Sequence, residues 1–305
     1  MHRTGGKTSP GRGPRRVHVC ASVRRGYRAT VIRALFLAAL GVLGLSPAIA
    51  PSATAAAWAP AATATIHPGV QTFTNGAQCT ANFVFESGTT VYIGQAAHCS
   101  STAGNTETNG CTTGSLPLGT PVEVTGASHP GTLVYNSWIT MQSIGETNPD
   151  ACAFNDLALI QLDPADVAKV NPSIPHWGGP VGINTSGTTL LSRVYSYGNS
   201  ELRGGIELLS PKLGVSMGDN GNGWSHRVNT VTPGIPGDSG SAFLDANGRA
   251  LGVLSTLGVS LPVPATNFVG DIARELDYMH AHNGPAATLV NGTVAFNPTQ
   301  VPLGI

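Results

Sequence analysis

Charged and aromatic residues are scarce in this chain of 305 residues, at 10% and 6%. No charged residue lies between Arg33 and Glu86, and no acidic residue precedes Glu86. Turn-forming residues are abundant instead, with 39 glycines and 22 prolines. Because glycine and proline form turns and interrupt helices, the composition favours a loop-rich β protein over a helical bundle.

The formal net charge of zero conceals an uneven distribution of charge. Nine of the 16 basic residues precede position 34, whereas all 16 acidic residues lie at or after Glu86. Without the N-terminal segment, seven bases remain against 16 acids, a net charge near −9. Phosphate backbones are bound by basic surfaces, so an acidic body argues against a nucleic-acid partner.

The sequence also lacks the spacings typical of protein metal sites. It contains neither a Cys-x-x-Cys pair nor a His-Glu-x-x-His helix. We therefore expect no metal and no other cofactor.

An export signal is predicted over residues 1–50. Basic residues end at Arg33, and twelve apolar residues follow at 34–45. The small-residue sites Ala-Ile-Ala and Ala-Thr-Ala then occupy 48–50 and 53–55. This order is typical of a signal peptide, and twelve apolar residues are short for a membrane span. We expect cleavage after residue 50, or as late as 55–57, and a secreted protein without stable membrane association. The alternative is an uncleaved membrane anchor.

Four cysteines remain once the segment that contains Cys20 is removed: Cys79, Cys99, Cys111 and Cys152. An even number of cysteines in an exported chain favours disulfides over free thiols. Two bridges are expected, and the count alone leaves three pairings open.

Short β-like segments separated by glycine, proline and asparagine recur from residue 66 onward. They lie at 81–85, 90–94, 121–124, 132–134, 157–162, 190–197, 205–209, 226–231, 241–244 and 250–256. A cluster of prolines and glycines at 172–180 divides them into two groups. Such a series of short strands is typical of a sandwich or barrel. The Ala/Thr/Pro-rich residues 51–65 are expected to be a leader remnant or pro-segment.

The pattern changes near the C-terminus. Apolar residues recur at spacings of four, four and three from Phe268 to Met279, which predicts a helix over 269–280. Residues 289–296 predict a small hairpin around Asn291 and Gly292, within a C-terminal tail at 284–305.

Three motifs, in the order histidine, aspartate, serine, carry a chemical signal. Ser239 lies in Gly-Asp-Ser-Gly at 237–240, His98 ends the β-like run 91–97, and Asp156 precedes the alternating segment 157–162. A serine hydroxyl becomes an effective nucleophile only beside a positioned base and donors for an oxyanion. Each residue alone is an ordinary turn or strand-end residue, but together they predict a catalytic triad.

The sequence resembles the chymotrypsin-like serine peptidases, specifically the secreted trypsin-like peptidases of bacteria. The resemblance is carried by Ala-Ala-His-Cys at 96–99, Asp-Leu-Ala-Leu at 156–159 and Gly-Asp-Ser-Gly at 237–240. It implies an all-β fold of two packed six-stranded antiparallel β-barrels with a C-terminal helix. The peptidase domain would cover residues 66–283, with barrel one at about 66–175 and barrel two at about 180–283.

The resemblance also implies a role for each residue. Ser239 attacks the scissile carbonyl, His98 transfers the proton, and Asp156 orients His98. The backbone N–H groups of Gly237 and Ser239 form the oxyanion hole. Ser255 would hydrogen-bond Asp156, although an ordinary strand serine is the alternative. No residue would bind a cofactor.

For the cysteines, the resemblance implies a bridge between Cys79 and Cys99. The remaining pair would then be Cys111 and Cys152.

Asp238, the acid before the nucleophile, needs a cationic partner if it is buried. In many relatives this partner is the N-terminus released by zymogen cleavage. The present chain lacks the familiar Ile-Val-Gly-Gly start, and its nearest candidate region is 66–70. We predict an internal arginine instead, Arg203 first and Arg193 second.

The expected specificity pocket contains no acid. By the resemblance its floor corresponds to Pro233 with Gly234 beside it, and Leu257 would narrow one wall. Because neither floor residue can pair with an arginine or lysine, we expect cleavage after small or medium apolar residues. The alternative is acidic specificity through His226 and Arg227.

The sequence thus predicts a secreted serine endopeptidase that acts on protein or peptide substrates. One alternative is a catalytically silent binding module of the same fold, although such proteins usually lose a triad member. Another is a serine esterase, whose Gly-x-Ser-x-Gly elbow is absent around Ser239.

Overall fold

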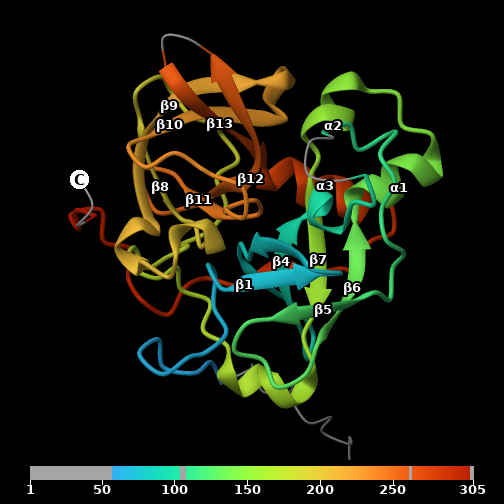
Figure 1. The fold of residues 1–305 in the computed structure, drawn as a ribbon, viewed down its shortest axis with the longest axis horizontal. Coiled ribbons are helices and arrows are strands. Elements are labelled where there is room, and N and C mark those ends of the chain that lie inside the picture. Colours follow the sequence, from blue (N-terminus) through green and yellow to red (C-terminus); the bar gives the residue numbers. More distant parts are fainter. Residues whose placement is uncertain (1–56, 104–107, 261–262, 303–305) are drawn as a thin grey trace, which may run out of the picture. The chain divides into compact units, whose positions relative to one another are not determined.

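The computed structural model describes residues 57–103, 108–260 and 263–302. The predicted export signal lies outside these ranges. None of the helices in the described residues is long and apolar enough to cross a membrane. The structure is mostly β, with two antiparallel sheets and few helices, as predicted (Figure 1).

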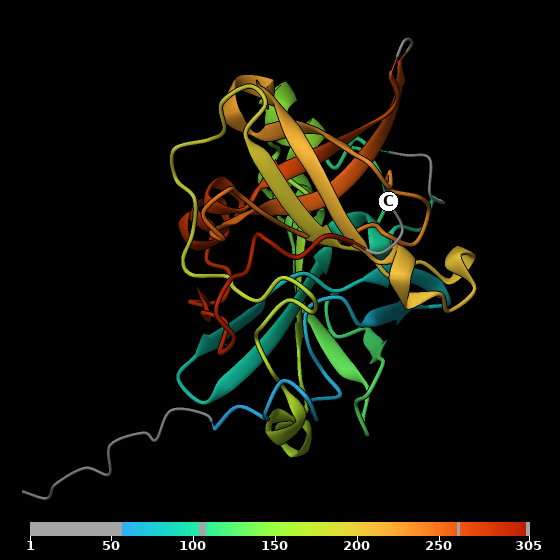
Figure 2. The ribbon, with the colours of Figure 1, turned by 90° about the vertical axis from the view of Figure 1, so that its left-hand side faces the viewer.

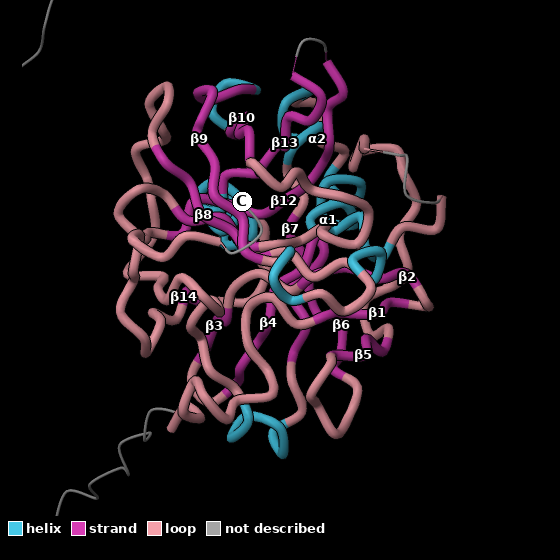
Figure 3. Tube along the Cα trace, turned by 60° about the vertical axis from the view of Figure 1, so that its left-hand side comes forward, coloured by secondary structure: helices cyan, strands magenta, loops and turns pink. Residues whose placement is uncertain are grey.

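The first half of the described chain, together with one strand of the C-terminal tail, forms an eight-stranded antiparallel sheet in the order β14-β3-β4-β7-β6-β5-β1-β2. The strands are β1 (Gln71–Thr74), β2 (Ala77–Thr80), β3 (Val84–Ser87), β4 (Thr90–Ala96), β5 (Pro121–Val124), β6 (Gly131–Asn136), β7 (Leu157–Gln161) and β14 (Thr288–Leu289). Figure 3 shows β14 beside β3. Only residues 81–83 separate β2 from β3, so the Cα atoms of Thr80 and Val84 lie at most about 14 Å apart. The sheet must therefore curl until β2, at one end of the order, meets β3 near the other.

This sheet has eight strands where six were expected. Residues 77–87 contribute two of them, β2 and β3, because the chain bulges between them: the N–H of Asn82 and the carbonyl of Phe83 both bond Gly94 of β4, while the N–H of Phe83 donates to Asn82 Oδ1 at 2.7 Å. The predicted strand at 81–85 therefore begins only at Val84. The eighth strand, β14, comes from the C-terminal tail.

The second half forms a closed six-stranded barrel in the order β10-β13-β12-β11-β8-β9. Its strands are β8 (Arg193–Tyr197), β9 (Pro211–Asn220), β10 (Ser225–Thr230), β11 (Ala242–Leu244), β12 (Ala250–Ser260) and β13 (Val263–Asp271). The barrel core is a cluster of buried apolar side chains: Val194, Val228, Phe243, Leu251, Leu254 and Val269. In Figure 2 these strands, gold to orange, lie above those of the first sheet. The predicted six-stranded barrel is confirmed for this half.

The predicted strand at 205–209 is wrong. The chain between β8 and β9 forms two 3₁₀ turns, η3 (Glu201–Arg203) and η4 (Glu207–Leu209). Gly204 and Gly205 separate them at φ of 62° and 76°. This left-handed conformation suits glycine and interrupts an extended strand. Similar turns occur at η1 (Ala97–Ser100), η2 (Pro164–Lys169) and η5 (Gly221–Gly223).

Three α-helices complete the described elements. Helices α1 (Ser137–Ile144) and α2 (Pro149–Phe154) follow β6 and are N-capped by Asn136 and Asn148. The predicted C-terminal helix is present as α3 (Ile272–Ala281). It begins three residues later than expected because β13 continues to Asp271, whose side chain caps the helix by accepting from the N–H of Arg274.

A shared hydrophobic core joins the two halves. It contains buried side chains from both sheets and from α3, among them Phe83, Leu157, Tyr195, Leu244 and Leu276. Their burial removes apolar surface of both sheets from water, which stabilises the packing of one half against the other.

The segments on either side of the predicted peptidase domain pack onto it. Ala59 donates its N–H to the carbonyl of Val170 at 2.8 Å. The predicted hairpin at 289–296 is wrong, because Thr288 and Leu289 pair with β3 instead. Gly292 bonds the carbonyl of Pro180 at 2.8 Å, which holds the rest of the tail against the crossover between the halves.

Candidate active site

The register of two buried strands brings His98 and Asp156 together. In the antiparallel pair β4 and β7, Ala96 lies opposite Leu157. The chain leaving β4 therefore passes the chain entering β7. His98 follows two residues after Ala96, and Asp156 precedes Leu157 by one.

Two hydrogen bonds fix the carboxylate of Asp156 to His98. Asp156 Oδ2 lies 2.7 Å from His98 Nδ1, and Oδ1 accepts from the backbone N–H of His98 at 2.9 Å. Asp156 is only 2% exposed. Because a carboxylate only accepts hydrogen bonds, Nδ1 must carry the proton, and Nε2 of the neutral ring is left as a base.

The predicted contact of Ser255 with the same carboxylate is present. Ser255 Oγ, on β12, donates to Asp156 Oδ2 at 2.6 Å. A residue of the second barrel thereby helps to orient an acid of the first sheet.

Asp156 also changes the proton affinity of His98. Burial alone would lower the pKa of His98, but the charge and hydrogen bond of Asp156 outweigh burial and raise it above its ordinary value. The carboxylate therefore stabilises the imidazolium form of the ring.

Ser239 shares one cavity with these residues. A cavity of about 270 Å³, which we call the site cavity, is lined by His98, Asp156, Ser239, Ser255 and Leu257, among others. Ser239 lies in the loop between β10 and β11, and its carbonyl accepts from the N–H of Thr80 at 2.8 Å. The three predicted triad residues thus line the same space.

The two N–H groups predicted for the oxyanion hole are free and held in position. Among the described residues, no acceptor bonds the N–H of Gly237 or Ser239. The peptide that carries the Gly237 N–H is fixed through the Pro236 carbonyl, which accepts from Ser200 Oγ. The peptide of the Ser239 N–H is fixed through the Asp238 carbonyl, which accepts from the Ser241 N–H at 3.0 Å. In a planar trans peptide, fixing the carbonyl also fixes the direction of the N–H.

This loop requires glycine at two positions. Gly237 has φ of 94° and Gly240 has φ of 89°. A Cβ on Gly240 would lie 2.4 Å from the backbone oxygen of Thr80. Both conformation and space therefore exclude a side chain there.

Asp238 is fully buried and pairs with two cations. Arg203, the first predicted partner, bonds Asp238 Oδ2, whereas Arg193 is exposed on β8. Lys212 on β9, which the sequence did not single out, places Nζ 3.0 Å from the same oxygen. Burial lowers the pKa of Lys212, the charge and hydrogen bond of Asp238 raise it, and the charge of Arg203 lowers it; together they place the pKa at about 8. The sequence offered one indication of this role for Lys212: basic residues are scarce, and Lys212 is one of only seven after position 34.

The predicted pocket residues separate into two groups. Leu257 lines the site cavity and is 40% exposed. Gly234 lies behind it, since a Cβ there would be 2.9 Å from Leu257 Cδ2. The carbonyl of Pro233 accepts from Arg203 and Lys212, each at 3.3 Å, so Pro233 belongs to the buried charge cluster.

His226 is not available to a substrate carboxylate. It is fully buried, with Nδ1 2.8 Å from Asp219 and Nε2 2.9 Å from Asp271. Burial would lower the pKa of His226, but these two carboxylates outweigh it and raise the pKa. Both ring nitrogens of His226 are therefore already occupied. Arg227, the other residue of the acidic-specificity alternative, is exposed on β10 and is not among the residues that line the site cavity.

Both disulfide pairings implied by the resemblance are present. Cys79–Cys99 ties β2 to η1 beside His98, with Cα atoms 6.2 Å apart. Cys111–Cys152 ties the loop after η1 to α2, which leads into Asp156, with Cα atoms 5.1 Å apart.

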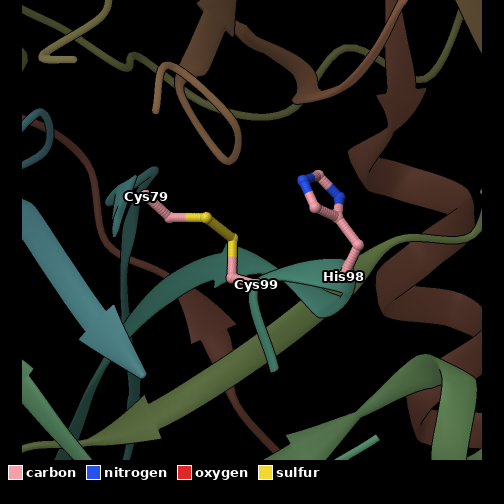
Figure 4. A group of neighbouring side chains, drawn as sticks. All are labelled: Cys79, His98 and Cys99. Carbon is pink, nitrogen blue, oxygen red and sulfur yellow. A yellow bond between two sulfur atoms is a disulfide. The ribbon is translucent and has the colours of Figure 1, made fainter. Parts of the chain in front are cut away.

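One group of potential metal ligands occurs among the described residues. Atoms of Cys79, His98 and Cys99 lie within 4.8 Å of one another. Figure 4 shows that the two sulfurs are joined to each other, with the His98 ring beside them. Cysteine binds a metal ion as a thiolate, and a cysteine in a disulfide has no thiolate. This group therefore does not fit a metal ion.

The sequence matches no protein-family model and no curated protein. Among solved structures it is similar to protease A of Thermobifida fusca, at 18% identity and a TM-score of 0.48, over 74% of this chain and 99% of that one. It is similar to a glutamic acid-specific serine protease at 16% identity and a TM-score of 0.47, over 74% of this chain and 100% of that one. It is also similar to the chymotrypsin of Cellulomonas bogoriensis, at 17% identity and a TM-score of 0.44, over 74% of this chain and 98% of that one.

Proposed function

We propose that this protein is a serine endopeptidase that cleaves peptide bonds through an acyl-enzyme. The observation that carries the proposal is the arrangement of His98, with Nδ1 bonded to buried Asp156 and Ser239 in the same cavity. This arrangement supplies a base, its orienting acid and a nucleophile.

In the proposed reaction, Ser239 Oγ attacks the scissile carbonyl carbon while His98 Nε2 takes the hydroxyl proton. The N–H groups of Gly237 and Ser239 bind the oxyanion of the tetrahedral intermediate. Asp156 stabilises the imidazolium, which then donates its proton to the leaving amine. His98 next activates a water molecule that hydrolyses the acyl-enzyme and frees Ser239.

The buried pairs of Asp238 support activity without insertion of a new N-terminus. Arg203 and Lys212 supply the positive charge that a buried carboxylate next to the nucleophile requires. We propose that this internal pairing holds residues 233–239 in the competent conformation.

We further propose that the protein is secreted and that residues 66–283 form the peptidase domain. Two disulfides are typical of an oxidising compartment. The uncharged, apolar Leu257 on the wall of the site cavity supports cleavage after small or medium apolar residues.

Hydrolysis of casein, compared with hydrolysis of a short-chain p-nitrophenyl ester, tests the proposed activity. The full chain, exported and purified from the medium, is expected to cleave casein. Ser239→Ala and His98→Ala should each lose activity by roughly 10⁴-fold or more. Hydrolysis of the ester but not of casein would indicate an esterase. Hydrolysis of neither substrate would indicate a binding module.

A further inference from the structure

A buried carboxyl group lies directly behind the predicted triad acid. Glu275 is on α3, and its side chain is fully buried. Its Oε1 accepts a hydrogen bond from the backbone N–H of Asp156 at 2.8 Å. The contact joins the C-terminal helix to a residue that lies 119 positions earlier in the chain.

Every polar group of Asp156 is then engaged. Its carboxylate binds His98 and Ser255, and its carbonyl accepts from the N–H of Ala97 at 2.8 Å. Among the described residues, Glu275 is the acceptor of its N–H. Without Glu275, a buried N–H at the start of β7 would lose its partner, at a cost comparable to a lost hydrogen bond.

The surroundings of Glu275 disfavour a charged carboxylate. No basic side chain pairs with it in the described part of the chain, whereas Asp156 and Asp271 both lie nearby. Tyr135 on β6, which is close enough to interact electrostatically with Glu275, is an uncharged phenol with a buried hydroxyl. Burial raises the pKa of Glu275 well above its ordinary value, and repulsion from the two aspartates acts in the same direction.

The space around the carboxyl is also closely fitted. A Cβ on Gly270, at the end of β13, would lie 2.6 Å from Glu275 Oε1 and 2.9 Å from the carbonyl oxygen of Phe154. A methyl group at position 270 would therefore crowd the Glu275 carboxyl most closely, and the Phe154 carbonyl as well, without changing any charge.

We propose that Glu275 is a positioning residue for Asp156, the triad acid. The neutral carboxyl of Glu275 accepts the Asp156 N–H and so directs the Asp156 carboxylate toward His98. The inference rests on the proposed serine peptidase function. Glu275 touches neither the substrate nor the nucleophile in this account, and it acts through Asp156.

The test compares Glu275→Gln with Glu275→Met in the full chain. Turnover of a peptide p-nitroanilide is measured per active site titrated with a fluorophosphonate, together with KM and the pH profile of kcat/KM. Glu275→Met is expected to lose about tenfold in kcat with KM nearly unchanged, since one oriented hydrogen bond is lost. The acid limb of the kcat/KM profile of Glu275→Met should move to lower pH, because a misdirected Asp156 carboxylate stabilises the imidazolium form of His98 less well. Glu275→Gln keeps a neutral hydrogen-bond acceptor, so its kcat and its acid limb should both match those of the wild-type protein.

Two further variants separate positioning from folding. Asp277→Met replaces an exposed acid on the same helix and should match the wild-type protein. Gly270→Ala should reproduce the loss of kcat in a chain that retains Glu275. It replaces Glu275→Met in the test if Glu275→Met does not fold.

The proposal is overturned if Glu275→Met, or Gly270→Ala in its place, keeps wild-type kcat per titrated site and an unmoved acid limb. It is also overturned if Glu275→Gln lowers the acid limb as Glu275→Met does, because the required group would then be a charged carboxylate. A wild-type protein that does not react with the fluorophosphonate would instead contradict the proposed function itself, and this inference with it.

Discussion

Lys212 Nζ lies 3.0 Å from Asp238 Oδ2, and both side chains are completely buried. Arg203 bonds the same carboxylate oxygen, so two cations share one acid directly before the predicted nucleophile. Both cations also bond the carbonyl of Pro233, at 3.3 Å. The cluster therefore ties η3 and β9 to both ends of the loop 233–238.

Replacing Arg203 is expected to weaken both the fold and the activity. Arg203→Ala should lower the free energy of unfolding by about 3 kcal/mol, since it removes one partner of a buried ion pair. Displacement of the loop should lower kcat between about 10- and 100-fold. Arg193→Ala, at an exposed position, is the matched control. Urea unfolding and peptide hydrolysis measure the two effects, and equal behaviour of the two variants would show that Arg203 is not the anchor.

Lys212 should make stability rise with pH in the alkaline range. Its pKa is lowered to about 8 in the native state, chiefly by burial. In the unfolded state a lysine titrates at about 10.4. Between these values the unfolded state binds more protons, so the free energy of unfolding rises with pH, by up to about 3 kcal/mol from this group. Unfolding at pH 7 to 10 in the wild-type protein and Lys212→Met measures the difference. A difference that stays constant or falls with pH would contradict this placement of Lys212.

Activity should fall in acid as His98 gains its proton. Because the charge and hydrogen bond of Asp156 outweigh burial and raise the pKa of His98, half of the activity should be lost above the ordinary histidine value of about 6.5. Asp156→Asn should lower kcat by about 10⁴-fold and move the acid limb to lower pH. The pH profile of kcat/KM provides the measurement. An acid limb that Asp156→Asn leaves unmoved would mean that another group controls it.

Leu257 should limit the size of the side chain before the scissile bond. Leu257→Gly is expected to improve cleavage after phenylalanine relative to alanine by about tenfold, since a few methylene groups in a pocket change the rate on this scale. Peptides that differ only at that residue measure the ratio. Leu190→Gly, an exposed leucine outside the site cavity, is the control. Preferential cleavage after arginine, lysine or glutamate in the wild-type protein would contradict the assigned pocket.

The spacing of motifs identified the pair His98 and Asp156 and placed Ser239 in the same cavity. His98 and Asp156 were predictable because each stands at the end of a recognisable strand, and the pairing of those strands brings them together. Arg203 was predictable because a buried Asp238 needs a cation and few basic residues are available.

Lys212 and Glu275 were not predictable in the same way. Each lies within a regular element, where a polar residue is ordinarily solvated, and only tertiary packing buries it. The break at Asn82 and the turns around Gly204 were missed for a similar reason. They depend on a side-chain hydrogen bond and on left-handed backbone angles, which hydrophobic periodicity does not report.

Covalent labelling of Ser239 is the most direct test of the proposed mechanism. A fluorophosphonate reacts with a serine only when a neighbouring base and an oxyanion hole activate it. Intact-mass and peptide mass spectrometry should find one adduct per chain, on Ser239. The adduct should be absent from Ser239→Ala and strongly reduced in His98→Ala. An unlabelled folded protein, or an adduct on another residue that persists in Ser239→Ala, would contradict the account.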